Sequence, residues 1–453
     1  METATGFQLI LALVLGIALL VWLILRTKVH VFLALILSAA VTGLIAGLDV
    51  GQIAATISSG FGNTLGNIGA VIGFGVMMGK LLEISGAAER MALTFLRLFG
   101  RGREEWALAS TGYVVSIPIF CDSGFVVLSP LAKALARQSG RSVVTLGVAL
   151  AAGLVVTHHA VPPTPGPLAV AGLFGVDLGL MILYGLLFAI PPLILMVLYA
   201  RWLGRQLEPD DLEVAGQAAG EEAQGAAAVA RDEASLPSAT AAFAPIVVPL
   251  ILIFANSLVT ALKVEGAWVG YIKLLGSPVI AVGIGLLLAI YGLSREASRE
   301  QVIRWMEQGI ASAGTIILVT GGGGALGAVL QASGIGNYLA GTIAASALPA
   351  VLLPFIVATI VRIAQGSGTV AMITAASVSA PMLAGTGTNM VLAAVAATQG
   401  AMVLSYFNDS YFWVVNRLLG ITDVKKQLRT WSVPTTLGWA TALVVLLIAS
   451  LFL

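Results

Sequence analysis

The chain has 453 residues, of which 58% are hydrophobic and 10% charged, with a mean hydropathy of +0.99 and a formal net charge of +1. These values exclude an ordinary soluble domain and indicate a polytopic membrane protein. The near-zero net charge gives no reason to expect a nucleic-acid partner, and the single cysteine, Cys121, cannot form a disulfide within the chain.

Apolar runs long enough to cross about 30 Å of hydrocarbon recur along the whole sequence. They cover residues 7–25, 29–48, 67–83, 142–158, 178–200, 241–262, 270–293, 313–331, 388–405 and 431–452. The first run has no basic region before it and no small-residue cleavage site after it, so we expect a retained span and not a signal peptide. The sequence predicts an all-α fold with roughly ten spans.

Residues 106–137 form an apolar stretch interrupted at its centre by Pro118, Asp122, Ser123 and Gly124. Proline breaks a helix, and a carboxylate inside a bilayer is costly, which makes it a functional candidate. Lys and Arg accumulate in cytoplasmic loops and flank this stretch on both sides, so we expect it to enter from the cytoplasm and return there. The pattern predicts a re-entrant helical hairpin; alternatively, Asp122 only caps the second helix.

The next span, residues 142–176, is interrupted as well. Thr157, His158 and His159 end its first helix, because the prolines that follow prevent its continuation. These prolines are Pro162, Pro163, Pro165 and Pro167. We predict a discontinuous helix with its polar break inside the membrane.

Residues 204–240 gather acidic side chains among alanines and glycines, a composition that cannot bury a core. We expect a flexible cytoplasmic linker between two halves, residues 1–203 and 241–453.

The two halves resemble each other. Residues 73–92 match residues 321–340 at seven of twenty positions, and residues 117–126 match residues 361–370 at four. An internal duplication is therefore expected. Basic residues follow the first glycine-rich copy but precede the second, which predicts an inverted repeat with both termini outside.

The duplication predicts a second hairpin at residues 347–383, around RIAQGSGT, and a second broken helix at residues 388–418, around VLSYFNDSYFWVV. Inverted repeats whose broken helices meet near the midplane are typical of secondary transporters. Free N–H groups and positive dipole ends at such breaks suit an anion. We therefore place a binding site where the hairpin tips and helix breaks meet.

Arg362 is the only arginine expected inside the membrane and is the candidate clamp for a carboxylate. Alternatively, it forms a structural ion pair with Asp122 or Asp409, or caps nearby carbonyl groups. The predicted substrate-binding residues are Asp122, Ser123, Gly124, Thr157, His159, Arg362, Gln365, Gly366, Ser367, Gly368, Thr369, Ser405, Asn408, Asp409 and Ser410. A coupling proton needs a group that titrates near the working pH, as a buried carboxyl group or a histidine can. The candidates are Asp122, Asp409, His158 and His159. Lys80 and Glu83 are expected to reach the inner interface.

Five ordered motifs stand out: IPIFCDSGFVVLSPLAKALA, THHAVPPTPGPLAVAGLFG, GGGGALGAVLQASGIG, RIAQGSGTVAMITAA and VLSYFNDSYFW. Together they resemble the gluconate permease family of gluconate:proton symporters, over nearly the whole chain outside the linker. The resemblance implies proton-coupled import of sugar acids such as gluconate across the cytoplasmic (inner) membrane. Kinship with the ion transporter superfamily implies a homodimer and elevator-type alternating access. The tip Cys121-Asp122-Ser123 departs from many members and Thr164 from some, which leaves D-serine or another hydroxy acid open as the substrate.

Other functions fit the sequence less well. Sodium coupling is an alternative to proton coupling, because helix breaks rich in Ser, Thr and Asn can bind that ion, whereas an ion channel would more often be a symmetric ring. A membrane hydrolase would need an activated serine, and Ser367 lacks the usual G-x-S-G setting. Residues 322–327 spell G-x-G-x-x-G, but no strand precedes them, so close helix packing explains these glycines better than a dinucleotide. We expect a transporter and not an enzyme, with no cofactor and no metal site.

Overall fold

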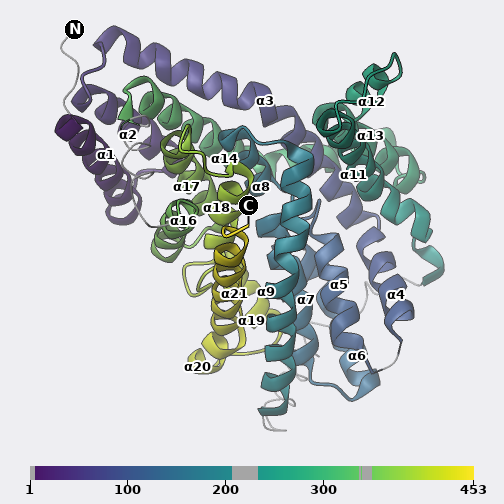
Figure 1. Ribbon diagram of the computed structural model, residues 1–453. Helices are drawn as coiled ribbons and strands as arrows, with labels where there is room; N and C mark the ends of the chain where they lie inside the picture. The colour runs from purple at the N-terminus through teal and green to yellow at the C-terminus, as the bar shows by residue number, and fades with distance from the viewer. Residues whose placement is uncertain (1–5, 101, 207–232, 336–337, 339–348, 453) are drawn as a thin grey trace.

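The computed structural model describes residues 6–100, 102–206, 233–335, 338 and 349–452 (Figure 1). Within these ranges the chain forms helices and turns, and no strand. The helices of the first half are α1 (Gly6–Arg26), α2 (Val31–Ile45), α3 (Val50–Ile84), α4 (Ala87–Phe99), α5 (Glu104–Val115), α6 (Cys121–Ser139), α7 (Val143–Ala160), α8 (Pro165–Phe174) and α9 (Leu178–Gln206). After a short turn of 3-10 helix at Glu233–Ser235, the second half contains α11 (Ala239–Ala261), α12 (Val269–Leu275), α13 (Pro278–Leu293), α14 (Arg299–Ala332), α16 (Leu352–Gln365), α17 (Gly368–Leu383), α18 (Met390–Gly400), α19 (Ser410–Leu418), α20 (Val424–Gln427), a π-helical turn (Leu428–Ser432) and α21 (Val433–Ala449). The predicted all-α membrane fold is confirmed.

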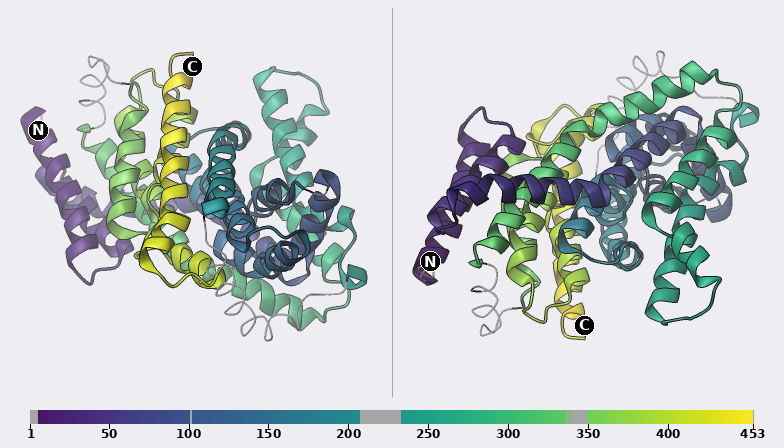
Figure 2. Two further views of the ribbon diagram at one scale, coloured as in Figure 1. Left: turned by 90° about the horizontal axis from the view of Figure 1, so that it is seen from below. Right: turned by 90° about the horizontal axis from the view of Figure 1, so that it is seen from above.

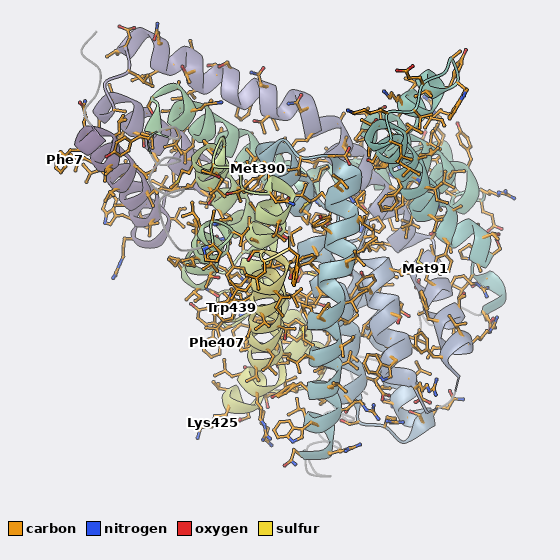
Figure 3. All side chains as sticks on the ribbon, in the orientation of Figure 1. Phe7, Met91, Met390, Phe407, Lys425 and Trp439 are labelled. Atoms are coloured by element: carbon orange, nitrogen blue, oxygen red, sulfur yellow. The ribbon has the colours of Figure 1, made fainter. Side chains whose placement is uncertain are left out.

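Seven helices of the described residues are long and apolar enough to cross a membrane, and the bent pair α12–α13 would make an eighth. Two of the ten expected runs, 29–48 and 388–405, instead form the short apolar helices α2 and α18, of 15 and 11 residues. Phe7 on α1 points away from the rest of the protein and is 76% exposed, as suits a side chain that faces lipid (Figure 3).

Two long helices, α3 and α14, run side by side across the molecule, between α1 and α2 on one side and α11 to α13 on the other (Figure 2). They have 35 and 34 residues, which corresponds to about 50 Å each. Gly60 of α3 lies against the backbone of Gly324 and Ala325 of α14, where a β-carbon would not fit. Glycine therefore allows the two backbones to approach closely.

The remaining helices include two short helical hairpins and two interrupted helices. Hairpin 1 is α5 and α6, joined by residues 116–120, and hairpin 2 is α16 and α17, joined by Gly366 and Ser367. The first break, residues 161–164, separates α7 from α8, and the second break, residues 401–409, separates α18 from α19. The segments predicted from the sequence are residues 106–137 and 347–383 for the hairpins and residues 142–176 and 388–418 for the broken helices; residues 347 and 348 lie outside the described residues.

Local sequence explains these interruptions. Three prolines close behind Ala160 cannot donate the backbone hydrogen bonds that would continue α7. At the tip of hairpin 2, Gly366 adopts a left-handed conformation with φ of +87°, which ends α16, and the Ser367 side chain then caps α17 by accepting from the Val370 N–H. The Asp409 carboxylate caps α19 by accepting from the Tyr411 N–H.

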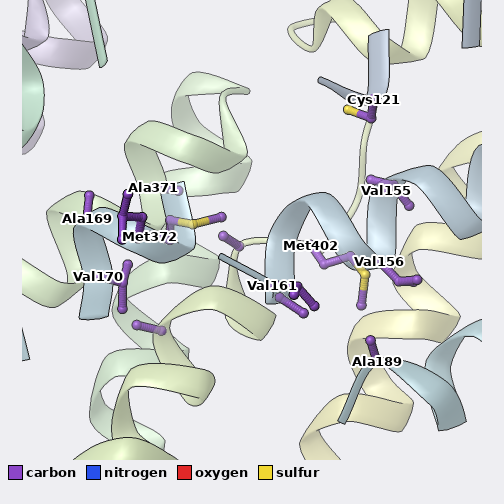
Figure 4. Close-up of a cluster of buried hydrophobic side chains, with 14 of the residues drawn as sticks. Cys121, Val155, Val156, Val161, Ala169, Val170, Ala189, Ala371, Met372 and Met402 are labelled. Atoms are coloured by element: carbon purple, nitrogen blue, oxygen red, sulfur yellow. The ribbon is translucent and has the colours of Figure 1, made fainter. Parts of the chain in front are cut away.

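The two hairpins and the two broken helices form a second group of helices beside α3 and α14. Helix α7 lies at its centre, and every residue from Val144 to Ala160 is buried. Apolar side chains around the first break come from distant parts of the chain: Val156 and Val161 flank Met402 of the second break, while Ala169 and Val170 of α8 lie beside Ala371 and Met372 of α17 (Figure 4). The breaks are therefore held in an apolar core and not in lipid.

The linker expected at residues 204–240 lies mostly outside the described residues, which exclude 207–232. At its edges, α9 continues to Gln206 and α11 begins at Ala239. Arg90 of α4 donates to the carbonyl oxygens of Glu233, Leu236 and Pro237, so the described end of this segment is attached to α4.

Candidate functional site

The hairpin tips, α7 and the second break surround one central cavity of about 260 Å³. Its walls come from the beginning of α6, the end of α7, the tip of hairpin 2 and the beginning of α19. The lining residues are Cys121, Asp122, Val155, His158, His159, Arg362, Gln365, Gly366, Ser367, Gly368, Thr369, Asn408, Asp409, Ser410 and Tyr411.

Three helices, α6, α17 and α19, begin at the wall of this cavity. The first turn of a helix presents free N–H groups and the positive end of the helix dipole. Three such ends around one small space favour a bound anion.

Arg362 supplies a full positive charge at the same place. Its side chain is 3% exposed, and Nη2 lies 2.5 Å from Oδ2 of Asp409. Ser405 also donates to Asp409 Oδ2. Arg362 Nε makes no hydrogen bond to any described residue, so the guanidinium retains a donor beyond the Asp409 pair.

Hairpin 2 is held against the second break by backbone and side-chain contacts. Tyr406 Oη and Asn408 Nδ2 both donate to the carbonyl oxygen of Ile363, at 2.6 and 3.1 Å. A β-carbon on Gly366 would meet the carbonyl group of Asn408. Glycine at position 366 is therefore required both for its left-handed φ and for this close approach.

The two histidines occupy different positions beside the cavity. His159 Nδ1 lies 2.9 Å from the Val155 carbonyl oxygen, so the proton of a neutral ring sits on Nδ1 and Nε2 is left as an acceptor. His159 Nε2 lies against Gly368 at the start of α17, where a β-carbon would not fit. The His158 ring packs against Phe120, with ring centroids 5.6 Å apart.

Asp122, in the first turn of α6, lines the cavity together with Asp409. The Ser410 side chain contacts its carboxylate, and Oδ1 is buried without a hydrogen bond to any described residue. Two carboxylates, one arginine and two histidines thus face one small space, which gives the site groups for both an anion and a proton.

Four of the residues predicted to bind substrate do not line this cavity. Ser123 faces a second cavity, on the other side of the hairpin 1 tip. Gly124 packs against Leu154, Thr157 is fully buried within α7, and Ser405 acts through Asp409. The other predicted residues, with His158, are brought together.

Sequence reasoning missed Val155 and Tyr411, and did not assign Cys121 to the lining. Tyr411 donates to the Ala151 carbonyl oxygen at 3.3 Å and closes one wall. In the sequence, only its position next to Ser410, at the start of a helix, could have indicated that Tyr411 lines the cavity.

A helical membrane protein with two hairpins, two broken helices and a central polar cavity has the architecture of a membrane transporter. The GntP family permease model matches residues 8–452 of the chain. The chain therefore belongs to the GntP permease family.

Several proteins are similar over nearly their whole length. An uncharacterized permease of Haemophilus influenzae is 50% identical over 449 residues, covering 98% of this chain and 92% of that protein. A gluconate permease of Pseudomonas aeruginosa is 34% identical, covering 99% and 98%. The Gnt-II system L-idonate transporter of Escherichia coli is 35% identical, covering 93% and 94%.

Solved transporters share the fold at low sequence identity. The YdaH transporter of Alcanivorax borkumensis superposes with a TM-score of 0.65 at 18% identity, covering 93% of this chain and 98% of that one. MtrF of Neisseria gonorrhoeae gives a TM-score of 0.68 at 13% identity, covering 96% and 97%. Together with the apolar helices, these findings establish a multi-pass membrane permease.

Proposed function

We propose that this permease imports gluconate or a closely related sugar acid across the cytoplasmic membrane by proton symport. The observation that carries the proposal is the central cavity, where Arg362 and three helix N-termini provide positive charge for a carboxylate. Gln365, Ser367, Thr369, Asn408 and Ser410 offer donors and acceptors for the hydroxyl groups. A volume of about 260 Å³ suits a small metabolite, since pockets for drug-sized ligands begin near 300 Å³.

The relatives support the substrate class. Two of the similar proteins are named for gluconate and L-idonate, and both are six-carbon acids that carry hydroxyl groups. The 50% identical relative is named only as a permease and adds no information on the individual acid.

Asp122 is the proposed proton carrier. It faces both the cavity and Asp409, and protonation of one carboxyl group would relieve the repulsion between two carboxylates around a bound anion. Binding of the proton together with the substrate would thus couple proton transport to substrate transport. His158 and His159 are the other candidates on the same wall.

We also propose elevator-type movement of the hairpins against α3 and α14. Glycines on the long helices meet the second group of helices: Gly75 and Gly79 of α3 face Pro163 and Pro118, and Gly323 and Gly327 of α14 face Ser377. Glycines leave a smooth surface along which a neighbouring helix can move.

These contacts are unequal in the two halves, which supports the proposal. Gly75 and Gly79 align with Gly323 and Gly327 in the duplicated segments 73–92 and 321–340. Gly79 meets the tip of hairpin 1 at Pro118 and Gly75 meets the first break at Pro163. Gly323 and Gly327 instead meet Ser377, ten residues beyond Ser367 at the tip of hairpin 2. Ten residues of helix correspond to about 15 Å. In the opposite transport state, the α14 glycines would contact the tip of hairpin 2, and the α3 glycines would contact hairpin 1 farther from its tip. The hairpins would then have moved along α3 and α14 by a distance of that order.

The proposed topology has both termini outside and a cytoplasmic linker. The end of α9 and α20 lie at the same edge of the protein (Figures 1 and 3). Arg201 and Arg205 are near the end of the α9 sequence, and α20 carries Lys425, which suits a cytoplasmic face. A homodimer is proposed from the family resemblance.

Uptake into proteoliposomes tests the proposed function. Radiolabelled gluconate should accumulate above its equilibrium level when a pH gradient is imposed, and unlabelled gluconate and L-idonate should compete better than D-serine or lactate. Accumulation driven by a sodium gradient at constant pH would replace proton coupling with sodium coupling, and equilibration without accumulation would favour a channel.

A further inference from the structure

A second cavity, of about 240 Å³, lies between the tip of hairpin 1 and the long helices α3 and α14. Its polar lining consists of Lys80 and Glu83 from α3, Asp122 and Ser123 from hairpin 1, and Gln308 from α14. Asp122 lines this cavity and the central cavity, so the tip of hairpin 1 separates the two spaces and one carboxylate faces both.

Lys80 and Glu83 form an ion pair in this second cavity, with 2.8 Å between Nζ and Oε1. Their side chains are 26% and 20% exposed. Rather than only reaching the interface, as the sequence suggested, they face the tip of hairpin 1 from the opposite wall. Charged groups in a membrane protein are costly unless they face water or serve a function, and here they face the carboxylate of the proposed proton carrier.

The position of Glu83 indicates which side of the membrane this cavity is nearest. Glu83 is the penultimate residue of α3, and the basic residues Arg90 and Arg97 follow on α4. Under the topology proposed above, this end of α3 is cytoplasmic. Ser123 and Gln308, which donate and accept hydrogen bonds, lie along the same cavity as Asp122 and Glu83.

We propose that the second cavity carries the coupling proton between Asp122 and the cytoplasm, separately from the substrate. The proton leaves the Asp122 carboxyl group for water in the cavity, protonates the Glu83 carboxylate, and passes from Glu83 to cytoplasmic water, so that both carboxylates end ionised. Lys80 is a positioning residue that holds Glu83 toward the cavity. The charged and titratable groups around Asp122 on this side are Lys80 and Glu83. Those on the other side are Cys121, His158, His159, Arg362, Asp409 and Tyr411. This inference rests on the proposed proton symport.

Two assays in proteoliposomes distinguish the steps. Net uptake driven by a pH gradient requires release of the proton in every cycle, whereas exchange of internal for external gluconate at equal pH can proceed with the proton retained. For Glu83→Gln we expect pH-driven net uptake to fall at least tenfold and exchange to stay within twofold of wild type. Glu83→Asp, which keeps a carboxylate, should restore most of the net uptake, and Lys80→Met should give an intermediate loss.

Glu300→Gln serves as the matched control, because Glu300 is an exposed carboxylate in the first turn of α14, and both of its rates should be normal. Equal loss of exchange and net uptake in Glu83→Gln, or normal net uptake, would overturn the route. Absence of any pH-driven uptake by the wild-type protein would instead reject the proposed symport itself, so the two failures are distinguishable.

Labelling tests the cavity independently of transport. In a Cys121→Ala background, Gln308→Cys should react with a membrane-impermeant thiol reagent applied from the cytoplasmic side, because water reaches it there. Reaction only from the opposite side, or none in a folded protein, would contradict a cytoplasmic proton route.

Discussion

Arg362 and Asp409 form a buried ion pair that joins hairpin 2 to the second break, with 2.5 Å between Nη2 and Oδ2. The pair has a structural role and a proposed functional role. It fixes the hairpin against α19, while Arg362 also lines the central cavity and its Nε has no hydrogen-bond partner among the described residues.

Comparing a single with a double substitution distinguishes the structural role of the pair from its role in transport. Arg362→Gln leaves Asp409 buried without its cation, so the free energy of unfolding should fall by about 3–5 kcal/mol. The double variant Arg362→Gln/Asp409→Asn removes both charges and should recover most of that stability, measured by thermal unfolding in detergent. Gluconate uptake should stay below a tenth of wild type in both variants, because no cation remains for the carboxylate. Near-normal uptake by the double variant would mean that the pair is only structural.

Asp122→Asn should uncouple transport from the proton. The amide keeps the size of the side chain but cannot release a proton, so pH-driven accumulation should be lost while some gluconate exchange remains. Uptake and counterflow assays on the same vesicles measure the two activities. Accumulation and exchange that both proceed at normal rates would remove Asp122 from the coupling mechanism.

The tip of hairpin 2 should tolerate no side chain at Gly366. Gly366→Ala incurs the cost of a left-handed backbone, about 1–2 kcal/mol, and forces a β-carbon against Asn408, which adds about 1–3 kcal/mol. Gly387→Ala is the matched control, since Gly387 has a φ of +78° but no neighbouring atom at its β-carbon position. We expect the thermal midpoint of Gly366→Ala to lie several degrees below that of Gly387→Ala, and its uptake to be reduced. Equal midpoints would show that the contact with Asn408 is unimportant.

Paired cysteines in a Cys121→Ala background should report the proposed exchange of contacts. Lys80→Cys with Ser123→Cys joins two residues that line the second cavity, so a short bifunctional thiol reagent should link them in the present state. The duplicated segments relate this pair to Ala328 and Ser367, which face different cavities here. Ala328→Cys with Ser367→Cys should link only in the opposite state, and each link should stop transport. Simultaneous formation of both links in one molecule would exclude an elevator.

Much of the fold could be predicted from the sequence, because membrane depth makes polar and helix-breaking residues conspicuous. Prolines after Ala160 and glycines around Ser367 are such residues, and helices α7 and α16 end there. Hydropathy does not show whether an apolar helix is surrounded by lipid or by other helices. The sequence of α7 therefore resembles that of an ordinary membrane span, although the helix is almost wholly buried inside the protein.

The site could be predicted as a set of segments but not residue by residue. Two residues of one motif can have different surroundings: Ser410 and Tyr411, at the start of α19, line the cavity, whereas Ser405, in the second break, donates to Asp409. Thr157 and His158 differ in the same way on α7. The second cavity depends on contacts between residues 80, 122 and 308, which no local pattern could indicate.

A structure of the protein with gluconate bound is the strongest test of carboxylate binding by Arg362. We predict density for the ligand between the N-termini of α6, α17 and α19, with its carboxylate on Arg362 and its hydroxyl groups near Asn408 and Ser410. Gluconate bound outside this cavity, or with its carboxylate turned away from Arg362, would contradict the account.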